Sequence, residues 1–247
     1  MLAITLASQS PQRSALLARL DLDVLVQPSD VDEAAVAVPA DPAGQVRTLA
    51  RAKAEAVAQQ RPERIVLGAD TLVALDGTVF GKPGTPAAAG AMLRRLSGRP
   101  HRVLTGIAVV VPAAGGHSLA LPEQRKDAAL QPQLEPVLPN LRIDAHPAGW
   151  TLTAVVSSTV TFRPIGDEEI AAYVGTGEPL NKAGAYGVQG AGRRFIASLS
   201  GCYTNVVGLP LCAVAAMLTL VCGRPVNCPS DAECRVKGEC RCLCRSA

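Results

Sequence analysis

Residues 65–83 place a carboxylate and a lysine within one short stretch, which has the sequence IVLGADTLVALDGTVFGKP. The aliphatic run at its start gives way to GADT at 68–71, so Asp70 follows the kind of buried strand whose end binds ligands in open α/β sheets. The strand pattern then resumes, and the Asp-Gly pair at 76–77 predicts a tight hairpin that returns Lys82 towards the carboxylate. A carboxylate and an ammonium that face one cleft predict a polyanionic substrate with a metal ion.

A second group of polar residues lies near the N-terminus, where a short apolar strand is expected over residues 3–7. Ser10 and Pro11 are typical of the cap and first position of a helix, expected over residues 12–20. Free backbone N–H groups, the positive end of the helix dipole and Arg13 together have the chemistry of a phosphate site. An ordinary capped surface helix explains the same residues equally well.

A second short strand is expected over residues 24–26. The segment between it and the next helix is rich in acids, among them Glu33. A helix is expected over residues 42–59, because Asp41 and Pro42 have the residue types that begin one. Lys53 lies along the apolar side of that helix. A lysine in that position usually extends its ammonium to water, so the pattern alone leaves a functional and a purely structural interpretation open.

Residues 176–192 form a glycine-rich stretch in which Lys182, Tyr186 and Gln189 offer hydrogen-bond donors. Glycines in such a stretch allow a backbone to approach a ligand closely. A glycine-rich loop alone is weak evidence of a site, but it gains weight beside a candidate metal-binding carboxylate.

The composition limits the classes of function. The 247 residues are 48% hydrophobic, which suffices for a core, while the net charge of +3 and the 3% aromatic content argue against a nucleic-acid-binding protein. The N-terminus lacks a basic leader, so we expect a cytoplasmic protein. Residues 206–222 are apolar but contain Gly208 and Pro210 and are short for a membrane span, so we interpret them as a buried helix.

Alternating strand and helix patterns predict one α/β domain over residues 1–222, in which residues 195–199 and 203–207 are expected to form a final hairpin around the Ser200-Gly201 turn. Residues 112–149 show no lasting helical or strand period and hold many prolines, so we expect a loop insertion there. Six of the eight cysteines lie between Cys222 and Cys244. Their spacing lacks the paired C-x₂-C of common zinc sites, which leaves metal binding or a disordered appendage for residues 223–247; we expect disorder.

Taken together, six spaced segments resemble the Maf family of nucleoside triphosphate pyrophosphatases. The resemblance implies an α/β fold with a mixed central sheet, flanking helices and two lobes around a cleft, related to the inosine triphosphate pyrophosphatases. It also implies a homodimer in many members. The segments are LASQSPQR at 6–13, the helix with Lys53, GADT at 68–71, GKP at 81–83, KAGAYGVQG at 182–190 and NVVGLPL at 205–211.

The resemblance further implies hydrolysis of a nucleoside triphosphate to the monophosphate and pyrophosphate, with Mg²⁺ or Mn²⁺. Asp70 matches the catalytic acid and a metal ligand of the family, and Glu33 is our candidate for a second metal-binding acid. The candidate substrate-binding residues are Ser8, Gln12, Arg13, Lys53, Thr71, Lys82, Lys182 and Gln189.

Three positions bear on which nucleotide is bound. Thr71 and Gln189 are similar to the subgroup that acts on dTTP and UTP, whereas Gln12 departs from it. That subgroup has a second arginine at this position, and the branch associated with 7-methyl-GTP has tryptophan. Gln12 matches neither branch, so a 7-methyl-GTP pyrophosphatase stays an alternative. So does a non-catalytic nucleotide-binding regulator, because Maf-like proteins are also associated with inhibition of septum formation.

Overall fold

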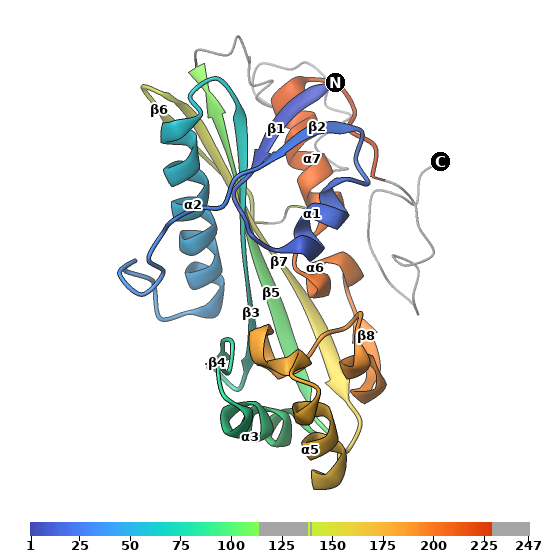
Figure 1. The fold of residues 1–247 in the computed structure, drawn as a ribbon. Helices are drawn as coiled ribbons and strands as arrows, with labels where there is room; N and C mark the ends of the chain where they lie inside the picture. Colours follow the sequence, from blue (N-terminus) through green and yellow to red (C-terminus); the bar gives the residue numbers. More distant parts are fainter. Residues whose placement is uncertain (114–137, 139, 229–247) are drawn as a thin grey trace.

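A computed structural model describes residues 1–113, 138 and 140–228 of the chain. These residues form one mixed eight-stranded sheet in the order β2-β1-β3-β5-β7-β6, with β4 beside β3 and β8 beside β7 (Figure 1). The β1–β2 and β1–β3 pairs are parallel and the other pairs are antiparallel. The strands are β1 (Leu2–Leu6), β2 (Leu22–Val26), β3 (Ile65–Leu75), β4 (Thr78–Phe80), β5 (Pro100–Pro112), β6 (Arg142–His146), β7 (Gly149–Phe162) and β8 (Ile196–Ser200).

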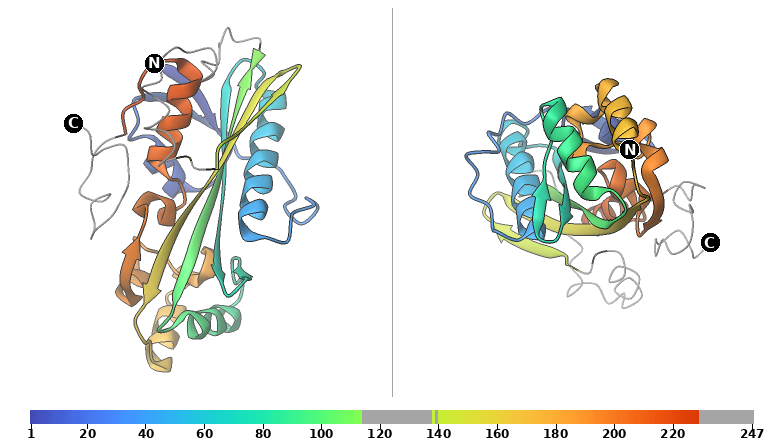
Figure 2. Two further views of the ribbon diagram at one scale, coloured as in Figure 1. Left: turned by 180° about the vertical axis from the view of Figure 1, so that it is seen from behind. Right: turned by 90° about the horizontal axis from the view of Figure 1, so that it is seen from below.

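Helices cover both faces of this sheet, as Figures 1 and 2 show: α2 lies on one face, and α1 and α7 lie on the other. The helices are α1 (Pro11–Leu17), α2 (Pro42–Gln60), α3 (Pro86–Leu96), α5 (Asp167–Gly175), α6 (Tyr203–Val207) and α7 (Leu211–Cys222), and the short 3₁₀ turns are η2 (Glu178–Asn181), η3 (Ala183–Ala185) and η4 (Ala191–Phe195). Among the described residues, none of these helices is both long and apolar enough to cross a membrane.

Two main hydrophobic clusters lie at opposite ends of the long central strands. One packs α1 and α7 against the sheet and includes Leu17 and Met217. The other packs α3 and α5 against the far ends of the strands and includes Phe162, Tyr173 and Phe195. Because each end has its own core, the molecule has two lobes that share β3, β5 and β7. The predicted fold class, a mixed sheet with flanking helices, is confirmed.

The first three helices begin in the same way, with a capping side chain followed by proline. The side-chain oxygens of Ser10, Asp41 and Thr85 accept hydrogen bonds from the first-turn backbone N–H groups of α1, α2 and α3. Each cap satisfies a donor that the helix itself leaves unpaired, and proline loses nothing at the next position. The helix starts expected at Ser10-Pro11 and at Asp41-Pro42 are therefore correct.

The β3–β4 hairpin is also as expected, and its turn explains the choice of residues. Asp76 and Gly77 have φ angles of 48° and 75°, which is the left-handed conformation that a two-residue hairpin turn requires at both positions. The hairpin returns the chain so that β4 pairs with β3, and Lys82 follows directly after β4. A local sequence signal thus determines where this lysine lies.

Two sequence expectations are wrong. The predicted loop at 112–149 contains β6, which pairs with the start of β7; five partly exposed residues were too few to show a period. The expected hairpin partner at 203–207 is α6 instead, because Asn205 Nδ2 donates hydrogen bonds to the Val103 carbonyl and to Ser158 Oγ. Most of the remaining insertion and the expected disordered tail lie outside the described residues.

Candidate active site

Asp70 lies in the middle of β3, where the neighbouring strand on one edge changes. β1 pairs with β3 as far as Leu67, and β4 pairs with it from Val73. On the other edge β5 continues, with Gly106 opposite Asp70. Residues 68–72 therefore border an opening between two strands, a position where α/β folds bind ligands. The sequence suggested that a strand ends near Asp70; instead β3 is unbroken and its neighbours end there.

Two glycines allow α2 to lie directly on the sheet beside this carboxylate. A Cβ at Gly68 would be 2.3 Å from the Ala50 carbonyl oxygen, and one at Gly106 would be 2.2 Å from another carbonyl oxygen of α2. The helix backbone thus fills the space that any other residue would need. Gly68 and Asp70 face the same side of β3, because side chains alternate along a strand. This packing brings Lys53 of α2 onto Asp70.

Lys53 lies between two carboxylates. Its Nζ is 2.7 Å from Asp70 Oδ1 and 2.8 Å from Glu33 Oε1. Lys53 and Asp70 are 8% and 9% exposed, so the ammonium does not extend to bulk water as a purely structural lysine would. A buried charge is stable only when it is paired, and here the pairing is already complete within the protein.

Glu33 reaches the cleft from the segment between β2 and α2, and more than half of its side chain is exposed. Partial burial favours a higher pKa for its carboxyl group. The hydrogen bond and charge of Lys53, with the charges of Lys82 and Arg13, outweigh this effect and hold the pKa of Glu33 below its ordinary value. Glu33 is therefore a carboxylate at neutral pH.

Arg13 connects three segments of the site. Its guanidinium donates four hydrogen bonds, to the carbonyl oxygens of Gly208 (2.9 Å) and Ala69 (2.8 Å) and to the hydroxyls of Ser8 and Thr71 (both 3.1 Å). Burial lowers the pKa of Arg13, while the charges of Asp70 and Glu33 oppose that shift. Most of its donors are thus used by the protein itself, which fits a residue that holds the site together.

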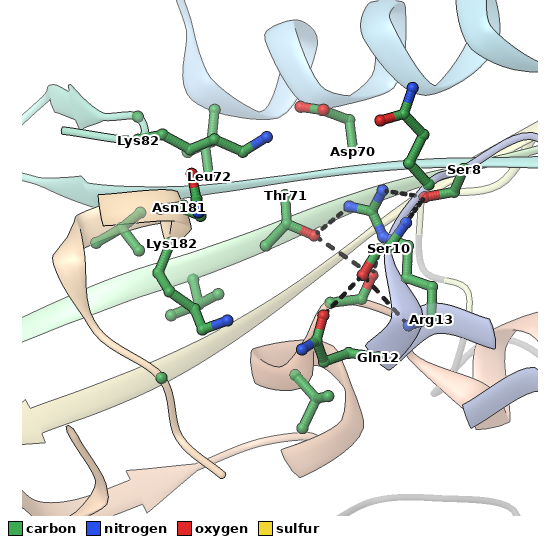
Figure 3. A pocket seen from close by; sticks show the side chains of 18 of the residues that line it. Ser8, Ser10, Gln12, Arg13, Asp70, Thr71, Leu72, Lys82, Asn181 and Lys182 are labelled. Atoms are coloured by element: carbon green, nitrogen blue, oxygen red, sulfur yellow. Dashed lines mark hydrogen bonds between the residues drawn. The ribbon is translucent and has the colours of Figure 1, made fainter. Parts of the chain in front are cut away.

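The other polar side chains at the start of α1 also bond to one another, as Figure 3 shows. Ser10 Oγ donates to Gln12 Oε1 at 3.2 Å, and the Ser10 backbone N–H donates to Ser8 Oγ at 3.2 Å. Thr71 Oγ1 lies 3.0 Å from Thr105 Oγ1 in addition to its bond with Arg13. The α1 helix has seven residues, so its dipole offers less to a phosphate than the longer helix expected from the sequence.

The ammonium groups of Lys82 and Lys182 differ from that of Lys53 because they make no hydrogen bond or ion pair with any residue that the structure describes. Figure 3 shows the Lys82 side chain extending in the direction of Asp70 and the Lys182 side chain extending in the direction of Gln12. The loops that hold them are joined by a hydrogen bond of 3.1 Å from the Gly184 backbone N–H to the Gly81 carbonyl. Two unpaired ammonium groups in one cleft are suited to bind phosphates.

All ten predicted site residues line one cleft of about 1290 Å³ between the two lobes. That volume exceeds the roughly 300–1,000 Å³ of ordinary small-molecule pockets, so a whole nucleotide can enter. The residues are Ser8, Gln12, Arg13, Glu33, Lys53, Asp70, Thr71, Lys82, Lys182 and Gln189.

Three further residues, Gly68, Gly106 and Glu178, shape the cleft but are not among the predicted site residues. Gly68 and Gly106 admit α2, and Glu178 lies against the glycine-rich segment, where its carboxylate accepts a hydrogen bond from the Ala191 backbone N–H. Glu178 belongs to the glycine-rich stretch already singled out, so its charge within an otherwise small-residue segment was an available signal. The helix contacts of Gly68 and Gly106 had no comparable sequence signal.

Asp70 and Glu33 supply the hard oxygen ligands that a divalent cation prefers, and Lys53 contacts one oxygen of each. In the part of the chain that the structure describes, no cluster of three or more His, Cys, Asp or Glu residues could hold a metal. Mg²⁺ is commonly held by only one or two carboxylates together with substrate phosphates. The donor set therefore fits a cation that binds with a phosphorylated ligand.

A family model described as Maf-like protein matches residues 3–131 and 140–221. The match includes every segment that lines the cleft. The chain belongs to the Maf family. Its sequence is 44% identical over 220 residues to the dTTP/UTP pyrophosphatase of Moorella thermoacetica, covering 89% of this chain and 95% of that protein.

Two further Maf relatives show the same likeness. The dTTP/UTP pyrophosphatase of Symbiobacterium thermophilum is 43% identical, with 89% of this chain and 94% of that protein covered. The dTTP/UTP pyrophosphatase of Anaeromyxobacter dehalogenans is also 43% identical, with 87% and 92% covered. The resemblance to the Maf family expected from the six sequence segments is therefore confirmed.

Proposed function

We propose that this Maf protein is a nucleoside triphosphate pyrophosphatase that hydrolyses dTTP and UTP to the monophosphate and pyrophosphate. The observation that supports this most is the composition of the cleft. Two carboxylates held by Lys53 share the cleft with the ammonium groups of Lys82 and Lys182, which have no ion-pair partner within residues 1–113, 138 and 140–228. The carboxylates suit a cation and a water molecule, and the lysines suit the triphosphate. The names of the relatives support the reaction and the pyrimidine substrates.

In the proposed reaction a water oxygen attacks the α-phosphorus, and the bond from that phosphorus to the α–β bridging oxygen breaks. Asp70 orients the water and receives its proton, while Lys82 and Lys182 offset the charge that develops on the departing pyrophosphate. Lys53 holds Asp70 and Glu33 in place beside each other. A divalent cation such as Mg²⁺ or Mn²⁺, when bound with the substrate, would lower the pKa of the attacking water.

For selection of the base we propose Gln189, which is exposed in the cleft on the glycine-rich segment and has both a donor and an acceptor. Thr71 has a different environment, since its hydroxyl bonds to Arg13 and lies close to Thr105. Its effect on the base would therefore act through Arg13. Gln12 faces the same cleft with a neutral side chain, so no second guanidinium fixes the triphosphate there.

The test is pyrophosphate release from a panel of dTTP, UTP, CTP, GTP and 7-methyl-GTP, with Mg²⁺ or Mn²⁺ added to metal-free protein. We expect dTTP and UTP to react fastest and the products to be monophosphate and pyrophosphate in equal amounts. Asp70→Asn is the inactive control, with folding checked by circular dichroism.

Several results would contradict the proposal. Release of inorganic phosphate would place the attack on the γ-phosphorus, and preference for 7-methyl-GTP would favour the other branch of the family. Absence of turnover with every triphosphate would favour the nucleotide-binding regulator. A cytoplasmic location, a homodimer and the lack of a nucleic-acid or membrane partner stay predictions.

A further inference from the structure

Glu178 lies so close to the glycine-rich segment that it explains two of the glycines. A Cβ at Gly190 would be 2.2 Å from Glu178 Oε1, and a Cβ at Gly187 would be 2.8 Å from the same oxygen. These glycines were expected to admit a ligand. In the structure the space beside them is occupied by a side chain of the protein, so their small size serves to admit the carboxylate.

The carboxylate is part of a hydrogen-bond chain that fixes both ends of this segment. Glu178 Oε2 accepts from the Ala191 backbone N–H at 2.9 Å, and Oε1 accepts from the Tyr173 hydroxyl at 2.9 Å. The Tyr173 oxygen in turn accepts from the Gly187 backbone N–H at 3.2 Å. Residues 187–191 are therefore attached at their first and last amides to one carboxylate, directly or through one phenol.

Residues between those attachment points line the cleft. Gln189 and Gly190 line the cleft, and so does Glu178 itself. Tyr173 belongs to α5 and is fully buried in the hydrophobic cluster that packs α3 and α5 against the sheet. The hydrogen bonds therefore connect the segment to the core of that lobe. Burial is the main reason why the pKa of Tyr173 is raised, and its bond to Glu178 adds to the shift; the phenol stays a neutral donor.

We propose that Glu178 is a positioning residue for substrate recognition, which holds residues 187–191 at both ends and thereby sets the place of Gln189 in the cleft. This role rests on the proposed function, because it assigns Gln189 to the nucleotide. Hydrogen bonds to a carboxylate are stronger than those between neutral groups, so the negative charge matters as well as the shape. A substitution at Glu178 should therefore weaken binding more than it slows the chemical step.

Glu178→Gln is the sharpest variant because it keeps size and shape. An amide has one acceptor oxygen where the carboxylate has two, so if that oxygen keeps the Ala191 N–H, the Tyr173 hydroxyl faces an NH₂ group and can no longer donate to it. Tyr173→Phe breaks the same chain at another atom by removing the acceptor of the Gly187 N–H. Glu168→Gln is the matched control, because Glu168 is an exposed acid on α5 whose carboxylate has no hydrogen bond or ion pair among the described residues.

Two measurements separate the possible outcomes. Amide hydrogen exchange of residues 187–191, measured without nucleotide, should become faster in Glu178→Gln and Tyr173→Phe but not in Glu168→Gln. For dTTP we expect KM to rise about ten-fold in Glu178→Gln, the size of one charge-assisted hydrogen bond, with kcat changed by less than about two-fold. Thermal unfolding confirms that each variant is folded.

The positioning role would be overturned by unchanged hydrogen exchange at 187–191 in folded Glu178→Gln, whatever its activity. It would also be overturned by a fall in kcat with unchanged KM, which would place Glu178 in the chemical step. Failure of the unmodified protein to hydrolyse any triphosphate would instead overturn the proposed function. The two failures are distinguishable because the exchange measurement needs no turnover.

Discussion

The ammonium nitrogen of Lys53 lies 2.7 Å from Asp70 Oδ1, and both residues are buried. The same nitrogen lies 2.8 Å from Glu33 Oε1, so one cation joins two carboxylates from separate segments. The hydrogen bond and charge of Lys53 favour the ionised form of Glu33. Lys53 is thus engaged by the protein without any ligand, and its predicted contact with substrate stays a prediction.

Replacement of Lys53 by methionine tests this arrangement through pH. Without the ammonium, burial acts on Glu33 with less opposition, so the pKa of Glu33 should rise. Because activity needs the carboxylate form, the acidic limb of the profile of kcat/KM against pH should move to higher pH. Lys182→Met is the control, since the Lys182 ammonium has no bond to Asp70 or Glu33. In this variant kcat/KM should fall while the acidic limb stays in place. An acidic limb that stays in place in Lys53→Met would contradict the role of Lys53 in keeping Glu33 ionised.

Gly106→Ala should separate α2 from the sheet. The new Cβ would meet a helix carbonyl at 2.2 Å, and backbone cannot yield as a flexible side chain does. We expect a loss of about 1–3 kcal/mol in the free energy of unfolding and a marked fall in kcat, because Lys53 moves away from Asp70. Urea unfolding and steady-state kinetics measure the two effects. Gly175→Ala is the control, since a Cβ there would have no atom within 4 Å.

Arg13 and Lys82 should respond differently to removal of their charge. Arg13→Met leaves four acceptors without their donor, so we expect a loss of about 3 kcal/mol in unfolding free energy together with loss of activity. Lys82→Met should change stability by less than about 0.5 kcal/mol, because Lys82 is exposed, and should lower kcat/KM about ten-fold. Equal stability of the two variants would show that Arg13 acts on the ligand alone.

His101 gives the fold a dependence on pH. It is 2% exposed, its Nε2 lies 2.9 Å from the Tyr186 hydroxyl, and burial lowers the pKa of His101 from 6.5 to about 4. Between these values the unfolded chain binds a proton that the folded chain does not. The free energy of unfolding should therefore fall as pH decreases through this window, by roughly 3 kcal/mol in all.

The check is urea unfolding at several pH values for the unmodified protein and His101→Gln, which keeps a polar partner for Tyr186. The slope of stability against pH between 6.5 and 4 should be smaller in His101→Gln, because the titrating group is gone. Identical slopes would mean that the pKa of His101 is not lowered in the folded protein.

Much of the site could be predicted from the sequence because its residues follow strong local signals. Asp70 belongs to a buried strand, Lys82 follows an Asp-Gly hairpin, and Lys182 and Gln189 lie in a glycine-rich stretch; all four line the cleft. Helix caps and hairpin turns depend on a few neighbouring residues, so their sequence patterns are reliable. The error at 203–207 arose where distant hydrogen bonds to Asn205 outweighed local β-propensity.

The sequence by itself determined which segments meet in the cleft and which charges they bring. Only the tertiary structure decided how those charges are used: Lys53 bridges two acids, Arg13 is bonded mostly to the protein, and Glu178 fills the space beside two glycines. The physical reason is that a charged side chain pairs with whatever packing places within a few ångströms. Here that depends on the backbone contact of α2 at Gly68 and Gly106, which no local pattern encodes.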